Sequence, residues 1–329
     1  MGNRANFVVV ADQDWRLYYA HWAGCRMLDA LIGGPELALR YVASLRACPK
    51  NEWVSPVWAD GGALIDLDRR RLLFFGDELM VTMAERRAML AVLGAVWPGY
   101  AVGWAYDGPA ELAGYVGAVW RDDPRPVDPT TKLTANRSAL CQVVSVVDAG
   151  GRLRLWPLRW TFSQAWHGPA LLDKLPGRGL TRMTLRTHPE GGVHIDVGRQ
   201  TMGEWHTADE LGICRELAGL WPGWQTESWG DGFEQQAERC GRALRLPELD
   251  LAAGADSARA WIRKRVYQSF ADSPAGHIAE LFKLLDPLAP GLVVSSDAAV
   301  NGGTRPTAAE WDRFAAACRE LRTRPAQSA

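Results

Sequence analysis

Long apolar runs, paired cysteines and an excess of charge of one sign are all missing from this chain of 329 residues. No run approaches the ~18 apolar residues of a membrane-spanning helix, so we expect no membrane partner. The six cysteines contain no C-x-x-C pair and no signal peptide precedes them, which predicts reduced thiols and a cytoplasmic location. The net charge of −1 disfavours a surface dedicated to nucleic acid, so no nucleic-acid partner is expected.

The short motifs of several common enzyme classes are missing as well. The sequence contains no GxxxxGK[ST], GxGxxG, HExxH or GxSxG pattern and no EF-hand loop. The phosphate-binding, dinucleotide-binding, zinc-protease, serine-hydrolase and calcium-binding mechanisms therefore have no support. We expect neither a cofactor nor a bound metal.

What the chain does contain is an internal repeat. Five short matching motifs, which we call stations, occur twice in the same order. They predict two diverged copies of one domain with a seam between them. The first set is Asn3-Arg4, Gly34-Pro35, Gly61-Gly62, Trp97-Pro98-Gly99 and Asp107-Gly108, and the second is Asn136-Arg137, Gly168-Pro169, Gly191-Gly192, Trp221-Pro222-Gly223 and Asp231-Gly232.

Each copy is predicted to be an α+β unit of order ββαββαβα. Short β-branched runs such as residues 7–10 are followed by polar turns, which is typical of hairpins. One helix begins at Pro35, because the first turn of a helix does not need the missing N–H, and another ends at Trp97, because Pro98 cannot continue it. Hairpins covered by helices predict an antiparallel sheet with one buried face.

The repeat divides the chain into four segments. Copy one spans residues 1–117, a proline-rich linker spans 118–135, copy two spans 136–241, and a helical extension without a counterpart spans 242–329. Apolar residues three and four apart in the extension predict three amphipathic helices, which we expect to dock on the duplicated core. Capping boxes are predicted at Thr82-x-x-Glu85, Thr207-x-x-Glu210 and Thr307-x-x-Glu310.

Tryptophan is the strongest compositional anomaly, with sixteen residues. Two pairs hold equivalent stations and are assigned to the core, namely Trp22 with Trp160 and Trp97 with Trp221. An indole offers a flat apolar face and one donor, and a guanidinium can bind a carboxylate with two hydrogen bonds. The candidate ligand-binding residues are Trp53, Trp58, Trp224, Trp229, Arg4 and Arg137. Core packing of the indoles and internal ion pairs of the arginines are the simpler alternatives.

Three residues are candidates for catalysis, namely His21, Asp66 and Asp77. His21 and Cys25 are four residues apart and would share one face of a helix, where a nucleophile pair could form. A small buried thiol is the simpler explanation. Asp66 recurs as Asp196, and paired carboxylates can perform acid–base chemistry on glycosides. The recurrence favours a structural role as a hydrogen-bond acceptor near a turn.

Two further groups of polar residues have simple explanations. The spacing of His188, His194 and His206 matches no pattern of metal ligands. The runs Arg69-Arg70-Arg71 and Arg263-Lys264-Arg265 are interpreted as solvated faces of a turn and a helix.

Two functions are consistent with these patterns. The first is a cytoplasmic binding protein that holds a partner protein or small ligand with aromatic residues at the seam between the copies. The alternative is an enzyme, such as a hydrolase, with a site at the same seam that uses His21 and acidic residues. The binding function is favoured, because no group of polar residues has a catalytic explanation stronger than its structural one.

Overall fold

The computed structural model describes residues 3–55, 58–120, 132–136, 141–159, 161–207, 212–267, 274–285 and 304–322. The chain forms two compact units. Unit 1 combines Met1–Trp120 with Asp250–Gln327, and unit 2 contains Arg121–Leu249. Among the described residues, no helix combines the length and the apolar composition that crossing a membrane would require.

Unit 1 contains a six-stranded sheet of order β3-β2-β1-β4-β5-β6. Its strands are β1 (Arg4–Ala11), β2 (Asp14–Ala20), β3 (Arg46–Cys48), β4 (Ala59–Asp66), β5 (Arg71–Gly76) and β6 (Ala101–Trp104). The predicted hairpins β1–β2 and β4–β5 are antiparallel, whereas β1–β4 and β5–β6 are parallel. A parallel pair needs a crossover connection, and helices between β2 and β4 and between β5 and β6 provide it. The sheet is therefore mixed. The sequence predicted an antiparallel sheet because only its hairpins could be recognised.

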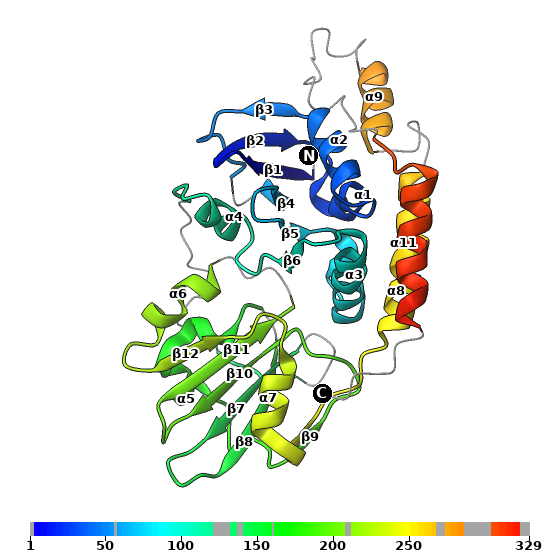
Figure 1. Cartoon of the computed structure of the whole chain (residues 1–329). Helices are drawn as coiled ribbons and strands as arrows, with labels where there is room; N and C mark the ends of the chain where they lie inside the picture. Colours follow the sequence, from blue (N-terminus) through cyan, green and yellow to red (C-terminus); the bar gives the residue numbers. More distant parts are fainter. Residues whose placement is uncertain are drawn as a thin grey trace. The chain divides into compact units, whose positions relative to one another are not determined.

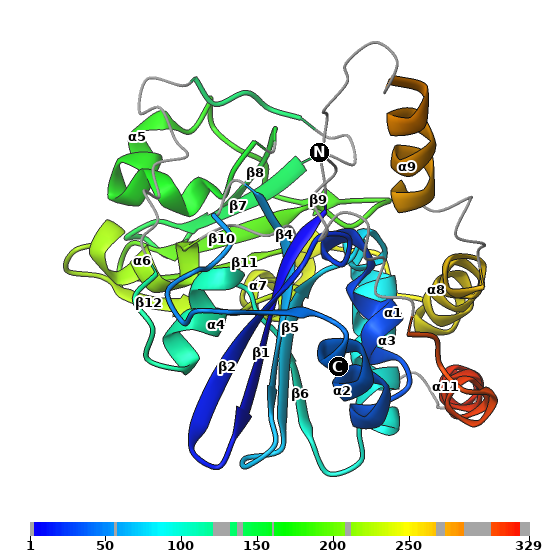
Figure 2. The ribbon, with the colours of Figure 1, turned by 90° about the horizontal axis from the view of Figure 1, so that it is seen from above.

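Helices cover both faces of this sheet (Figure 2). The helices of unit 1 are α1 (Met27–Leu31), α2 (Pro35–Ala43), α3 (Met83–Val96), α4 (Pro109–Tyr115), α8 (Leu251–Val266), α9 (Pro274–Leu285) and α11 (Ala308–Leu321), of which α1, α2 and α3 lie on one face of the sheet and α4 on the other. Adjacent strand residues point to opposite faces. Phe7 packs on Tyr41 of α2, with ring centroids 5.3 Å apart, whereas a side chain at Gly62 would contact Leu112 of α4. The α+β fold class is confirmed, with two buried faces in this unit rather than one.

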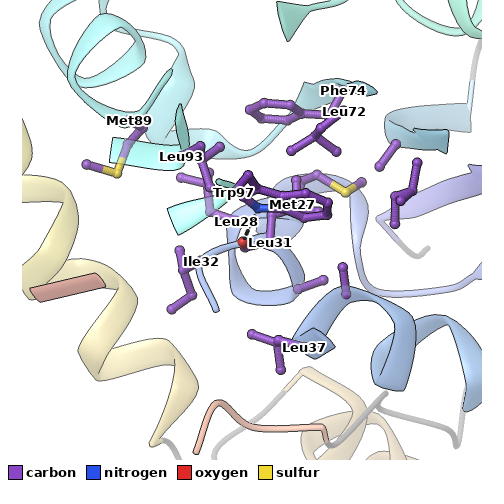
Figure 3. Packing of buried hydrophobic residues seen from close by; sticks show 14 of the residues in the cluster. Met27, Leu28, Leu31, Ile32, Leu37, Leu72, Phe74, Met89, Leu93 and Trp97 are labelled. Atoms are coloured by element: carbon purple, nitrogen blue, oxygen red, sulfur yellow. Dashed lines mark hydrogen bonds between the residues drawn. The ribbon is translucent and has the colours of Figure 1, made fainter. Parts of the chain in front are cut away.

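The core of unit 1 is organised around Trp97 (Figure 3). Its indole is fully buried and donates a 2.8 Å hydrogen bond from Nε1 to the carbonyl oxygen of Leu31. Leu28, Leu93 and Phe74 belong to the same buried cluster. A buried indole N–H needs an acceptor, and here the last residue of α1 supplies it. The end of α3 is thereby fixed against α1.

Unit 2 contains a five-stranded sheet of order β12-β11-β10-β7-β8 and a two-stranded sheet. The strands are β7 (Cys141–Val147), β8 (Leu153–Arg159), β9 (Met183–Thr184), β10 (Gly191–Asp196), β11 (Thr201–His206), β12 (Gln225–Ser228) and β13 (Leu244–Arg245). The helices are α5 (Leu171–Lys174), α6 (Ile213–Leu220) and α7 (Phe233–Cys240), and a 3-10 segment spans Gln164–Ala170 (Figure 1).

The two larger sheets share one pairing pattern. In each, two antiparallel hairpins are joined through their first strands by a parallel pairing, and a last strand adds in parallel. Trp221 ends α6 as Trp97 ends α3, and its Nε1 donates a 2.8 Å hydrogen bond to the carbonyl oxygen of Ala165. Gly34 and Gly168 both have positive φ before a proline. The units thus share a topology, and their descent from one duplicated domain stays a prediction.

The first pair of stations does not align in the structure. Gln142 lies opposite Gly191 as Ala5 lies opposite Gly61, so Arg4 corresponds to Cys141 by strand register. Asn136, by contrast, precedes β7 by several residues. The match of Asn3-Arg4 with Asn136-Arg137 is therefore wrong, because short identical pairs do not fix a strand register. Arg137 and Trp160 lie outside the described residues.

One of the three predicted capping boxes is confirmed. Thr307 and Glu310 exchange the expected side-chain to backbone hydrogen bonds at the start of α11. Thr82 precedes α3 without a side-chain capping bond. Glu210 of the third predicted box lies outside the described residues; α6 has Gly212 as its N-cap, and the Thr207 hydroxyl donates to the carbonyl oxygen of Glu190.

The predicted helices of the C-terminal extension are present, and α8 and α11 dock on unit 1. They lie side by side and pack against α3 (Figures 1 and 2). Ile262 of α8 and Phe314 of α11 are fully buried in the unit 1 core. Arg40 of α2 binds Glu310 with two hydrogen bonds of 2.9 and 2.7 Å. The chain therefore leaves unit 1, forms unit 2 and returns to complete unit 1.

Replacing Glu310 by glutamine is expected to reduce the loss of stability on acidification. The Arg40 guanidinium, with Thr307, lowers the pKa of Glu310 from 4.5 to about 2. Because the pKa is lower in the folded protein, the stabilisation is complete above pH 4.5 and is lost as the pH falls toward 2. The difference in Tm between the wild type and Glu310→Gln should shrink over this range. The exposed Glu36→Gln variant is the control, and a constant Tm difference for Glu310→Gln would contradict the prediction.

Candidate functional site

A group of charged and aromatic side chains lies at one end of the unit 1 sheet, where β1 and β4 begin. The chain after β2 crosses this end in direct contact with the strands. A Cβ on Gly61 would lie 2.6 Å from the carbonyl oxygen of Gly24, and one on Gly76 would lie 2.5 Å from Cα of Gly61. The Gly24 N–H donates to the carbonyl oxygen of Asn3 at 2.8 Å. This close approach requires glycine and brings side chains from four segments together.

Five residues form what we call the strand-end cluster: Arg4, Cys25, Trp58, Asp60 and Glu78. The guanidinium carbon of Arg4 lies 5.0 Å from the centroid of the Trp58 ring. The Trp58 side chain is nevertheless 48% exposed. Burial raises the pKa of Asp60, against the opposing effects of the Arg4 backbone N–H and guanidinium. Two of the predicted ligand-binding residues, Arg4 and Trp58, are thus in contact with each other.

Arg4 has unused hydrogen-bonding capacity. Its Nε is buried without a hydrogen-bond partner, and within the described part of the chain its side chain has no ion-pair partner. A buried N–H without an acceptor costs about 1–3 kcal/mol, more on a charged group. The face of an aromatic ring stabilises a guanidinium by only about 0.5–2 kcal/mol. The buried Nε is out of reach of a partner, so a partner's acceptor oxygen would meet the outer N–H groups of this half-buried side chain.

The thiol of the cluster is not an activated nucleophile. Burial, with the nearby carboxylates of Asp60 and Glu78, raises the pKa of Cys25 to about 11. The reactive form of cysteine is the thiolate, which is scarce at neutral pH when the pKa is this high. His21 and Cys25 also do not share a helix face, since His21 follows β2 and Cys25 lies in a 3-10 turn. The Nδ1 of His21 lies 2.9 Å from the Tyr19 hydroxyl.

The second catalytic candidate, Asp77, has structural partners at both carboxylate oxygens. Arg265 of α8 binds them with two hydrogen bonds of 3.0 and 2.9 Å. The backbone N–H groups of Leu79 and Leu28 donate to the same two oxygens. Arg265 also forms an ion pair with Asp29 at 2.8 Å. These contacts hold the segments after β2 and β5 against α8.

The third candidate, Asp66, lies at the other end of β4. One oxygen accepts the Arg69 N–H at 2.7 Å and the other accepts the Tyr115 hydroxyl at 2.8 Å. Six residues of extended strand separate it from Asp60, or about 20 Å. Asp66 is therefore too far from the strand-end cluster to act with it, and its contacts fit the structural role that recurrence in Asp196 favoured.

The remaining candidate tryptophans lie elsewhere and make packing contacts. Trp53 is half-buried between Trp15 and Trp120. Trp224 packs on the core residue Trp221, with centroids 5.3 Å apart. Trp229 lies on Gly203 of β11, and its Nε1 donates a 2.7 Å hydrogen bond to Glu227. Core and rim packing, the alternative explanation, accounts for these three residues.

The histidines of unit 2 do not converge. Directly paired residues share a face of a sheet, so His194 lies with Gly203, and His206 lies on the opposite face. His194 is buried beside Ser145, and burial lowers its pKa to about 4. Among the described residues, no three histidine, cysteine or acidic side chains are placed to hold a metal ion.

Sequence reasoning missed two residues that shape this end of unit 1. Asp60 carries no pattern of its own, although it directly precedes the Gly61-Gly62 station. Arg265 was interpreted as part of a solvated run, yet its side chain is only 7% exposed. The helical spacing of Arg265 with Ile262 and Ala258 places it on the buried stripe of α8 and could have revealed this.

The described residues of unit 2 contain no equivalent of the strand-end cluster. At the position of Gly61, Gly191 is contacted by the side-chain amide of Gln142 instead of a crossing backbone segment. Gln142 accepts the N–H of Gln164 at 2.6 Å. Comparison of the chain with family models, with curated proteins and with solved structures found no match.

Proposed function

We propose that this protein is a cytoplasmic binding protein that holds a partner protein through Trp58 and Arg4. The observation that carries the proposal is a half-exposed indole beneath a guanidinium that forms no ion pair within the described part of the chain. Tryptophan and arginine are the residue types most enriched among the dominant contacts of protein interfaces. Six free cysteines are consistent with a reducing compartment.

The chemistry of the cluster specifies what the partner should present. An apolar side chain would pack on the exposed face of Trp58, and a carboxylate or carbonyl oxygen beside it would accept from Arg4. The cation already held over the ring limits the entropy lost on binding. Unit 1 alone supplies these residues, and the predicted binding seam between the two copies stays a prediction.

The enzyme alternative also stays a prediction. Asp66 and Asp77 each have structural partners, and the Cys25 thiol is protonated at neutral pH. The hydrogen bond of His21 with Tyr19 and the edge-on contact of its ring with Trp22 are contacts that packing alone explains.

Trp58→Ala is expected to weaken partner binding about 30-fold or more while the protein stays folded. Loss of a dominant interface tryptophan costs about 2 kcal/mol or more, which is about 30-fold in Kd. The wild-type chain, immobilised, would capture partners from a lysate of its own source for quantitative mass spectrometry. Titration calorimetry with the purified partner would then give the Kd of each variant. Tm should change little, because an exposed residue contributes about 1 kcal/mol or less to folding.

Trp261→Ala is the matched control, since Trp261 is 50% exposed and lies beneath Lys264 in the same way. The wild type and this control should bind equally, and Arg4→Gln should bind more weakly than either. Equal capture by Trp58→Ala and the wild type would overturn the proposal. So would the absence of any protein that the wild type captures and Trp58→Ala loses.

A further inference from the structure

A second group of exposed cations lies at the opposite end of the unit 1 sheet, in the turn between β4 and β5. Arg69, Arg70 and Arg71 follow one another there. The aromatic ring of Tyr115, from α4, lies beneath two of them. The guanidinium carbons of Arg69 and Arg71 are 6.0 and 5.8 Å from its centroid. Two positive charges thus converge on one ring.

The backbone that presents these arginines is held by many hydrogen bonds. Asp66 accepts the Arg69 N–H and the Tyr115 hydroxyl. Asp68 accepts the N–H groups of Asp12 and Gln13 in the adjacent turn, at 3.0 and 2.8 Å. Arg70 has a φ of 50°, which a side chain adopts at some cost. The turn is therefore fixed before any ligand arrives, which lowers the entropic cost of binding.

Within the described residues, direct pairing of Arg69 and Arg71 with carboxylates is limited to one 3.5 Å ion pair between Arg69 and Asp66. The oxygens of Asp66 and Asp68 are already engaged as described, and Glu111 accepts the Asp107 N–H. Arg69 has only a 3.5 Å contact with Asp66, and its side chain is 74% exposed. Arg71 contacts Tyr115 but has no ion-pair partner within the described part of unit 1. Both guanidiniums retain N–H donors for an external anion.

The corresponding turn of unit 2 shows that folding does not require this arrangement. Asp196 accepts the Arg199 N–H at 3.0 Å, as Asp66 accepts that of Arg69. Thr201 stands at the position of Arg71 in the paired register. The same hairpin thus forms without a second arginine. Arg71 is therefore not required for this hairpin to form.

We propose that Arg69, Arg71 and Tyr115 form a binding site for a phosphoryl group. A single guanidinium can satisfy a carboxylate through two parallel hydrogen bonds, whereas two converging guanidiniums match the three oxygens and double charge of a phosphoryl group. The guanidinium carbons lie 6.0 and 5.8 Å from the centroid of the Tyr115 ring, so both cations are held at the same aromatic side chain. The group can belong to a small phosphomonoester or to a phosphorylated peptide. This site is separate from the strand-end cluster and does not depend on the proposed function.

The test is a set of titrations of the full chain at low ionic strength. Binding is monitored by calorimetry and by NMR of the arginine Nε–H groups. The probes are inorganic phosphate, phenyl phosphate, a phosphotyrosine peptide and its unphosphorylated form. Saturable binding of the phosphorylated probes alone is expected, with shifts confined to the turn. Tighter binding of phenyl phosphate than of the peptide would assign a small-molecule source, and the reverse would assign a peptide.

Arg69→Gln and Arg71→Gln should each weaken phosphate binding about tenfold. Arg71→Lys keeps the charge without the planar pair of donors, so it should recover only part of that loss. Arg199→Gln, at the counterpart of Arg69 in unit 2, is the control and should bind as the wild type does. Binding of no phosphorylated probe at millimolar concentration, or an equal loss in Arg199→Gln, would overturn the proposal.

Discussion

Asp77→Ala lowers the free energy of unfolding by about 3–5 kcal/mol, the largest effect we expect from removing a single charge. The substitution leaves the guanidinium of Arg265 buried and deprived of two hydrogen bonds. It also removes the acceptor of the Leu28 and Leu79 N–H groups. Asp29 still faces the arginine, but one carboxylate cannot satisfy all of its donors. Urea denaturation followed by circular dichroism would measure the change.

The double variant Asp77→Ala with Arg265→Met should recover part of the loss, because it removes both partners of this pair and keeps much of the arginine's volume, while Arg26 still pairs with Asp29. A buried ion pair often stabilises a protein no more than apolar residues of the same size do. Glu78→Ala is the control: its carboxylate lies 3.7 Å from Arg265 but is 59% exposed, so its loss should cost about 1 kcal/mol or less. Similar effects of Asp77→Ala and Glu78→Ala would contradict the assignment of Asp77 as the anchor of α8.

Trp97→Ala and Trp221→Ala are each expected to cost about 3–5 kcal/mol in their own unit. Both indoles are fully buried, and both Nε1 atoms donate 2.8 Å hydrogen bonds to a backbone carbonyl oxygen. The conservative Trp→Phe variants keep most of the apolar volume but leave the oxygen of Leu31 or Ala165 without this donor. Each should cost about 1–3 kcal/mol. If the two positions are equivalent, the paired variants should lose similar amounts of stability.

Hydrogen–deuterium exchange read peptide by peptide separates the two units. Trp97→Phe should weaken protection in unit 1 alone, and Trp221→Phe in unit 2 alone, because each indole contacts the core of its own unit. Trp224→Phe is a control in unit 2, since this residue is only half-buried on the surface of that core. A large loss for one tryptophan and none for the other would contradict their structural equivalence.

Part of the candidate site could be predicted from residue types. Trp58 is a candidate because an indole offers a flat apolar face, and Arg4 because a guanidinium can bind a carboxylate with two hydrogen bonds; the structure places the two in contact. The same reasoning also selected Trp53, Trp224 and Trp229, which make packing contacts instead. The residue type tells which contacts an indole is able to make. Whether its face is covered depends on chain segments that are distant in sequence.

Local sequence determined the elements of this protein. Proline after Trp97 and Trp221 ends two helices, spacing of three and four residues marks the C-terminal helices, and polar turns mark the hairpins. These features depend on residues within one or two turns of chain. Neighbouring residues are always within reach, so their effects can be read directly from their order.

Only the tertiary structure decided which polar groups meet. Asp77 and Arg265 are 188 residues apart, and their contact turns a candidate catalytic carboxylate into the anchor of a helix. The parallel pairing of β1 with β4 likewise depends on a crossover rather than on either strand alone. Such contacts form because packing of apolar surfaces brings distant segments together, and burial then makes any unpaired charge costly. The contact of Asp77 with Arg265 therefore depends on the whole fold and cannot be read from the sequence near either residue.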